Sequence, residues 1–126
     1  MTHHEFRAVP VLRIFDFDKA REFYVGFLGF SVDWEHRFEP GLPVYMQVSR
    51  DGLVLHLSEH HGDGSPGAVV LVYTKDLTAL QAELAAKEYP YLRPSLDEGP
   101  VPNSLSMQLQ DPFGNRLGFH ENLGVA

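Results

Sequence analysis

The sequence predicts an α+β domain made of two βαβββ repeats, whose strands form a cupped mixed β-sheet with the helices on its outer face. The order of one strand, one helix and three strands occurs twice along the 126 residues. A shift that places Asp16 on Asp76 also places Val9 on Val69. A single copy, with one sheet and one helix, is small for independent stability. We therefore expect the two copies to pair their sheets, within the chain or between chains.

The first repeat is expected over about residues 6–60. Its first strand carries Pro10, which favours an edge position because proline cannot donate to a neighbouring strand. Asp16 is a typical N-cap, and apolar residues follow it at helical spacing until Gly29. The expected elements are a strand at 9–14, a helix at 17–28, a strand at 30–35 and a hairpin with strands at 44–49 and 53–58.

A glycine-rich linker at 61–66 leads to the second repeat, expected over about residues 67–122. Asp76 is again the expected N-cap, followed by a second apolar stripe at helical spacing. The expected strands of this repeat lie at 69–73, 105–110 and 116–120, the last two joined by a turn at 111–115. The whole chain, 1–126, is expected to form a single domain.

Composition and charge narrow the classes of function. Ten Lys and Arg against 17 Asp and Glu give a net charge of −7, which repels nucleic acid and attracts small cations, although an acidic balance also serves solubility alone. No apolar run approaches the ~18 residues of a membrane-spanning helix. The first residues resemble no secretory signal, so a cytoplasmic location is expected.

Several kinds of catalytic site have no counterpart in the sequence. The chain has no cysteine, which excludes disulfides, zinc–thiolate sites and thiol nucleophiles. It also lacks the Gly-x-Ser-x-Gly elbow and the Gly-x-x-x-x-Gly-Lys phosphate loop. No catalytic residue is predicted, and general acid–base catalysis by His56 or a lone carboxylate stays open.

Strand alternation divides the side chains between a core and a cup. The core face is expected to hold Leu12, Ile14, Val44, Met46, Val48, Leu55, Leu57, Val70, Val72, Leu105, Met107, Leu109, Leu117 and Phe119. The cup face is expected to hold Val11, Arg13, Tyr45, Gln47, Val54, His56, Ser58, Leu71, Tyr73, Ser106, Gln108, Gln110, Arg116 and His120. Such a lining of apolar, aromatic, amide and imidazole groups suits binding of a flat or amphipathic molecule.

Two motifs carry a family resemblance. Glu-Phe-Tyr at 22–24 with Leu-Gly-Phe at 28–30, and Asp-Pro-Phe-Gly-Asn at 111–115, resemble the vicinal oxygen chelate superfamily. Within it the chain is most similar to bleomycin-resistance proteins and their glyoxalase-like relatives, from about Val9 to Glu121. The resemblance implies the glyoxalase/bleomycin-resistance fold, a scaffold that hosts isomerases, dioxygenases, transferases and non-catalytic binders.

The resemblance also implies where metal ligands would lie. Metal-dependent members carry one ligand on each of four strands, and the matching positions here are Val9, His56, Val69 and Gly118. Valine and glycine side chains bind no metal, and a single histidine is too few for a catalytic divalent site. We therefore expect no metal and no cofactor. His56 then lines the cup as a polar residue, with a role as metal ligand as the alternative.

The resemblance further implies an intimate homodimer that exchanges the first strand and captures a cationic drug by stacking and acidic groups. Pro10 matches the proline of the exchanging arm, or simply blocks an edge. Stacking candidates are Trp34, Phe38 and Tyr45, near Asp33, Glu35 and Glu39. Trp34 alternates with Phe30 and Val32, so a place in the core is its alternative. Asn103-Ser104 replaces the Trp-Gly of the family, which removes one stacking platform.

The predicted function is metal-free binding of a small organic molecule, with stoichiometric sequestration of a bleomycin-type antibiotic as the leading candidate and antibiotic resistance as its consequence. The expected ligand-binding residues are Trp34, Phe38, Tyr45, Gln47, His56, Gln108 and His120. The expected partners are a cationic or aromatic small molecule and a second copy of the chain, with neither nucleic acid nor membrane. The alternative is a metal-dependent glyoxalase or dioxygenase that uses His56, His120 and carboxylates. A third possibility is a relative without a ligand.

Overall fold

The computed structural model describes residues 2–124 and divides into two halves of matching element order. The first half contains β1 (Val11–Arg13), α1 (Phe17–Arg21), the π-helical turn η1 (Glu22–Phe27), β2 (Ser31–Arg37), β3 (Val44–Arg50) and β4 (Leu53–Ser58). The second half contains β5 (Val69–Tyr73), α2 (Leu77–Ala86), β6 (Asp97–Glu98), β7 (Ser104–Gln110) and β8 (Arg116–Asn122).

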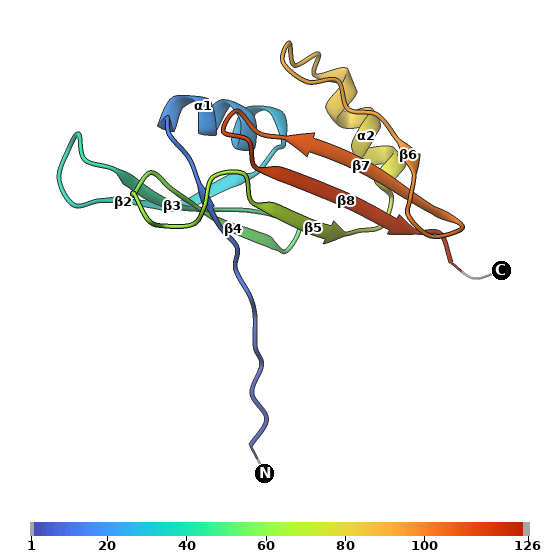
Figure 1. The fold of residues 1–126 in the computed structure, drawn as a ribbon, viewed down its shortest axis with the longest axis horizontal. Helices are drawn as coiled ribbons and strands as arrows, with labels where there is room; N and C mark the ends of the chain where they lie inside the picture. Colours follow the sequence, from blue (N-terminus) through green and yellow to red (C-terminus); the bar gives the residue numbers. More distant parts are fainter. Residues whose placement is uncertain (1, 125–126) are drawn as a thin grey trace.

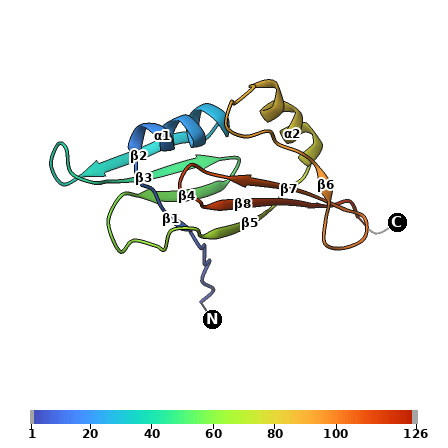
Figure 2. The same ribbon diagram turned by 45° about the horizontal axis from the view of Figure 1, so that its top comes forward.

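Each half forms a four-stranded mixed sheet, in the orders β1-β4-β3-β2 and β5-β8-β7-β6 (Figure 1). The first strand of each half runs parallel to the last, and the remaining pairs are antiparallel. Both helices lie on the same side of the sheets (Figure 2). The predicted α+β fold of two βαβββ repeats is confirmed. Residues 2–8 are exposed and lead away from the sheets to the N-terminus (Figure 1).

The first helix begins and ends where the sequence predicts. The carboxylate of Asp16 accepts from the backbone N–H of Lys19 at 2.8 Å, which caps α1. Gly29 then ends the helical segment with a φ of +78°, a conformation that favours glycine. The π-helical turn between them buries Phe23, Tyr24 and Phe27 on one side.

The second helix is capped differently from the prediction. Asp76 occupies the N-cap position with a left-handed backbone, φ 54°, and its side chain makes no capping bond. The carboxylate of Glu121, on β8, accepts instead from the backbone N–H groups of Asp76 at 2.9 Å and Leu77 at 3.0 Å. The prediction of an Asp76 side-chain cap is wrong, because a residue in a distant strand supplies the acceptor.

The core follows the predicted alternation closely. Leu12, Ile14, Val44, Met46, Val48, Leu55, Leu57, Met107, Leu109, Leu117 and Phe119 are all buried. Val70 and Val72 are only half-buried, because they lie on β5 at the edge of the second sheet. No helix of the described residues is long and apolar enough to span a membrane.

A buried polar cluster joins the two halves and explains the Asp-Pro-Phe-Gly-Asn motif. Asp111 is 3% exposed and accepts the hydroxyl of Tyr24 at 2.6 Å. It also accepts the backbone N–H groups of Phe113 and Asn115, which closes the turn. The Asn115 side chain donates to Asp111 and to the carbonyl of Arg13 in the other half. Burial, followed by the charge of Asp111, raises the pKa of Tyr24 well above its usual value of 10.0.

Candidate functional site

A β-bulge decides which face of the first sheet carries Trp34. Val32 pairs with Val48, but Trp34 pairs with Gln47, so Asp33 is an extra residue in β2. The bulge reverses the alternation and places Trp34 beside Tyr45 and His56 on the cup face, where it is 43% exposed. A place for Trp34 in the core is therefore wrong.

Three rings form a cluster on this face. The rings of Trp34 and Tyr45 are nearly parallel, with centroids 6.0 Å apart and an interplanar angle of 13°. The imidazole of His56 meets Trp34 edge-on at 5.3 Å and Tyr45 at 5.2 Å. Because each ring is held by the other two, the exposed face of Trp34 is a fixed platform for a flat molecule.

A series of hydrogen bonds connects Asp33, Gln47, His56 and Tyr45. Asp33 only accepts, so the Gln47 amide nitrogen donates to it at 3.0 Å, and the Gln47 carbonyl oxygen faces Nε2 of His56, also at 3.0 Å. Nε2 therefore carries the proton, and Nδ1 accepts the Tyr45 hydroxyl at 2.7 Å. Both ring nitrogens of His56 are thus engaged in hydrogen bonds.

The acidic end of this series of hydrogen bonds is the solvent-exposed carboxylate of Asp33. Asp33 accepts from Gln47 and from the hydroxyl of Ser49 at 3.0 Å, and these two bonds lower its pKa below 3.8. The Tyr45 hydroxyl at the other end has a pKa raised above 10.0, mainly by burial and also by the charge of Asp63. At neutral pH the cluster therefore presents an ionised carboxylate beside an aromatic surface.

A second cluster lies on the cup face of the second half. Gly118 pairs with Leu71 on one side and with Gln108 on the other. The rings of Tyr73 and His120 lie 5.7 Å apart. Leu71 and Tyr73 are 60% and 69% exposed, so this half of the cup presents apolar surface to solvent.

The seven predicted ligand-binding residues fall into these two clusters, with one exception. Trp34, Tyr45, Gln47 and His56 form the first cluster, and Gln108 and His120 belong to the second. Phe38 stands apart in the β2–β3 loop, 84% exposed. Within residues 2–124 no hydrogen bond or ring contact links the two clusters. A single chain thus presents two separate clusters on the cup face.

The donor set at the expected metal positions does not fit a metal ion. Both nitrogens of His56 are engaged in hydrogen bonds. A Cβ at Gly118 would lie 3.1 Å from the Gln108 oxygen and 3.2 Å from Nε2 of His120, so a ligating glutamate finds no free space there. Among the described residues no group of three His, Asp or Glu side chains converges as a metal site. We derive no chemistry through a metal for this cup.

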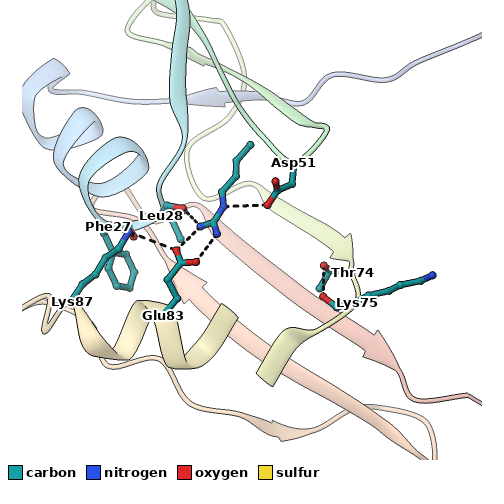
Figure 3. Close-up of polar contacts among 8 residues, drawn as sticks. Phe27, Leu28, Asp51, Thr74, Lys75, Glu83 and Lys87 are labelled. Carbon is teal, nitrogen blue, oxygen red and sulfur yellow. Dashed lines mark hydrogen bonds and ion pairs between the residues drawn. The ribbon is translucent and has the colours of Figure 1, made fainter. Parts of the chain in front are cut away.

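A cavity of about 610 Å³ lies between the halves and shares only Tyr73 with the predicted cup residues. Arg50 closes one side with paired bonds to Glu83 at 2.8 and 2.9 Å and one to the carbonyl of Leu28 (Figure 3). Its Nε also contacts Asp51 at 3.4 Å, so each of the three guanidinium nitrogens has a partner. Lys87 adds a bond to the carbonyl of Phe27 (Figure 3). These contacts join the two halves.

Comparison with known families agrees with the paired repeats and the cup. The sequence model described as "Glyoxalase superfamily protein" matches residues 3–125. The chain belongs to the glyoxalase superfamily. No curated protein sequence matches it significantly.

Solved structures share the fold of this superfamily member over almost its full length. A bleomycin-binding protein in complex with bleomycin is 23% identical, with a TM-score of 0.67, covering 94% of this chain and 99% of its own. TnmS3, an antibiotic-binding protein from Streptomyces sp. CB03234, is 23% identical, with a TM-score of 0.64 and coverages of 95% and 99%. A glyoxalase/bleomycin resistance protein from the same organism is 25% identical, with a TM-score of 0.63 and coverages of 89% and 98%.

Sequence reasoning missed one member of the first cluster. Ser49 donates to Asp33 and fixes its carboxylate next to Gln47. The available signal was its place two residues after Gln47, since residues two apart on a strand share a face. Simple alternation also places Asp33 on the cup side, opposite the core position that it gives Trp34, and therefore on the same face as Gln47 and Ser49.

Proposed function

We propose that this glyoxalase superfamily member captures a small organic molecule with a flat aromatic part and a cationic group, and that bleomycin-type antibiotics are its leading ligands. The observation that carries the proposal is the Trp34–Tyr45–His56 platform with the ionised carboxylate of Asp33 beside it. Capture is stoichiometric and needs no metal. Two structures with the same fold support this choice, since one holds bleomycin and the other is an antibiotic-binding protein.

The platform and the charge act on different parts of such a ligand. A ring stacked on Trp34 gains both buried area and the directional attraction between aromatic faces, about 0.5–1.5 kcal/mol beyond burial. The net charge of −7 raises the local concentration of cations, and Asp33 receives a cationic group at close range. In the cytoplasm, the location we propose, such capture would keep a drug from its target.

The proposed assembly is a homodimer in which the first half of one protomer faces the second half of its partner. Val69, Leu71 and Tyr73 on the cup face of β5 are 52%, 60% and 69% exposed, which is costly for apolar side chains in water. A partner would cover them and oppose the Trp34 cluster with Gln108 and His120. In the single chain β1 pairs with its own β4, and in the proposed exchange the first strand of the partner would take that place.

Calorimetric titration with bleomycin tests the ligand. Trp34 is the sole tryptophan, so its fluorescence reports on the platform in parallel. We expect saturable heat and an emission change, with affinity about tenfold lower in Trp34→Leu. Phe15→Leu, at an exposed ring outside the cup, is the matched control and should bind like wild type. Absence of heat would overturn the bleomycin assignment, and a stoichiometric, chelator-removable divalent ion in purified protein would overturn metal-free capture.

Sedimentation velocity tests the assembly independently of any ligand. We expect a dimer for the wild type and a monomer for Leu71→Glu, because a charge would be buried against the partner. Val101→Glu is the matched control, since Val101 is similarly exposed at 53% but lies in the loop before β7. A monomeric wild type at micromolar concentration would refute the proposed dimer.

A further inference from the structure

A second cavity, of about 560 Å³, lies outside the cup, between the first helical segment and the chain that follows α2. Its walls include Lys19 and Glu22 from α1 and η1, Tyr89 and Tyr91 from the segment after α2, and Gln110 and Asp111 at the end of β7. The volume falls within the range of small-molecule sites.

Two tyrosine rings form the aromatic part of this cavity. Tyr89 stacks on Phe27 with ring centroids 4.7 Å apart, which fixes its position. Tyr91 meets Tyr89 edge-on at 5.4 Å and is 77% exposed. Tyr89 is thus held in place and Tyr91 is largely exposed. Their rings offer electron-rich faces to a bound group.

The carboxylates of the cavity lack cationic partners. Asp111 is 3% exposed, and its oxygens are bonded only by neutral donors, from Tyr24, Phe113 and Asn115. Glu22 is exposed and, within the described part of the chain, forms no ion pair. Lys19 is the single cation of the lining, so negative charge is in excess.

The raised pKa of Tyr89 agrees with this excess of negative charge. Burial raises the pKa of its phenol above 10.0, and the charges of Glu22, Tyr91 and Asp111 raise it further. The amide of Gln110 is exposed at the end of β7 and can accept or donate to a polar group of a ligand.

We propose that this cavity is a second binding site, for a small organic ammonium ion, with Tyr89 and Tyr91 receiving the cation on their rings and Glu22 with Asp111 supplying the negative field. The site is separate from the Trp34 cluster, since the two share no residue. Lys19 opposes the ligand and limits its affinity.

Choline chloride is the probe, and 3,3-dimethyl-1-butanol is its neutral isostere. In ¹H–¹⁵N NMR titrations of the full chain at constant ionic strength, choline should shift the amides of Tyr89, Tyr91 and Gln110 and leave the Trp34 indole unchanged. The isostere should cause much smaller shifts. Equal shifts from both probes, or shifts confined to the Trp34 cluster, would overturn the proposal.

Charge variants sharpen the test. Glu22→Gln should weaken choline binding about threefold to fivefold, whereas Glu98→Gln, the same change at an exposed residue of β6, should leave it unchanged. Lys19→Gln should tighten binding about twofold to threefold, a gain that a merely structural lysine would not produce. Weaker choline binding in Lys19→Gln would refute the net negative field that the proposal assigns to this cavity.

Ring variants separate the aromatic contribution from folding. Tyr91 is largely exposed, so Tyr91→Leu should keep the NMR fingerprint of the fold while weakening choline binding about threefold. Tyr91→Phe keeps the ring and should retain the affinity. Unchanged binding in Tyr91→Leu would show that the ring does not receive the cation.

Discussion

Replacing Tyr24 by phenylalanine tests the polar cluster that joins the halves. The change removes only the hydroxyl that donates to Asp111 at 2.6 Å, and the ring continues to fill its place. Tyr24 is 0% exposed and Asp111 is 3% exposed, so no water replaces the lost donor. A hydrogen bond to a charged group in such a setting contributes about 1.5–3 kcal/mol. Asp111 keeps three other donors, which should let the variant fold.

Urea unfolding measures this loss directly. We expect the free energy of unfolding to fall by about 1.5–3 kcal/mol with an unchanged m-value, because the surface exposed on unfolding is the same. Tyr91→Phe loses an equivalent hydroxyl at an exposed position and should unfold like wild type. A Tyr24→Phe variant within about 0.5 kcal/mol of wild type would refute the role assigned to this bond.

Alkaline pH provides a second readout of the same bond. The folded-state pKa of Tyr24 is raised above 10.0, so the unfolded chain releases this proton first. The stability that depends on the proton is present below pH 10 and is lost as pH rises toward the folded-state pKa. The advantage of wild type over Tyr24→Phe should therefore shrink by about 1.4 kcal/mol by pH 11. An advantage independent of pH would contradict the raised pKa.

Four further substitutions test local features. Glu121→Ala should lower the free energy of unfolding by about 1 kcal/mol by uncapping α2, whereas Asp76→Gly, at a left-handed position, should cost little or nothing in urea unfolding. Gln47→Ala should raise the pKa of Asp33 toward its ordinary value in a ¹³C NMR titration, since the largest cause of its lowering is removed. Gly118→Glu should destabilise the fold by about 1–3 kcal/mol through crowding, and zinc should not restore its thermal stability.

The fold could be predicted because its determinants are local and periodic. Asp16 and Gly29 limit the first helix by short-range chemistry, and alternation assigns Leu12, Leu57 and similar residues to the core. The cap of α2 could not be predicted in this way, because Glu121 is 44 residues from Leu77 in sequence. A carboxylate in a distant strand leaves no local pattern, whereas Asp76 offers a misleading one.

The candidate site also combines features that a local sequence pattern predicts with features that it does not predict. Alternation predicts Tyr45 and Gln47 on the cup face, the family resemblance implies His56 there, and the structure joins the three by hydrogen bonds. The position of Trp34 depends on a bulge that no glycine or proline marks. One inserted residue moves an indole from one face of a sheet to the other, so local irregularity decides what strict periodicity cannot.

Gly118 and His56, two of the four expected metal positions, are both tied into the polar contacts of the cup. Gly118 leaves room for Gln108 and His120 to approach, and a longer side chain there would displace both. His56 is occupied by Tyr45 on one nitrogen and by Gln47 on the other, so a metal would have to break one of these bonds. Restoring a ligand at Gly118 alone would therefore disturb the polar groups of the cup without completing a coordination sphere. This coupling favours recognition by stacking and hydrogen bonding over metal-assisted chemistry at this cup.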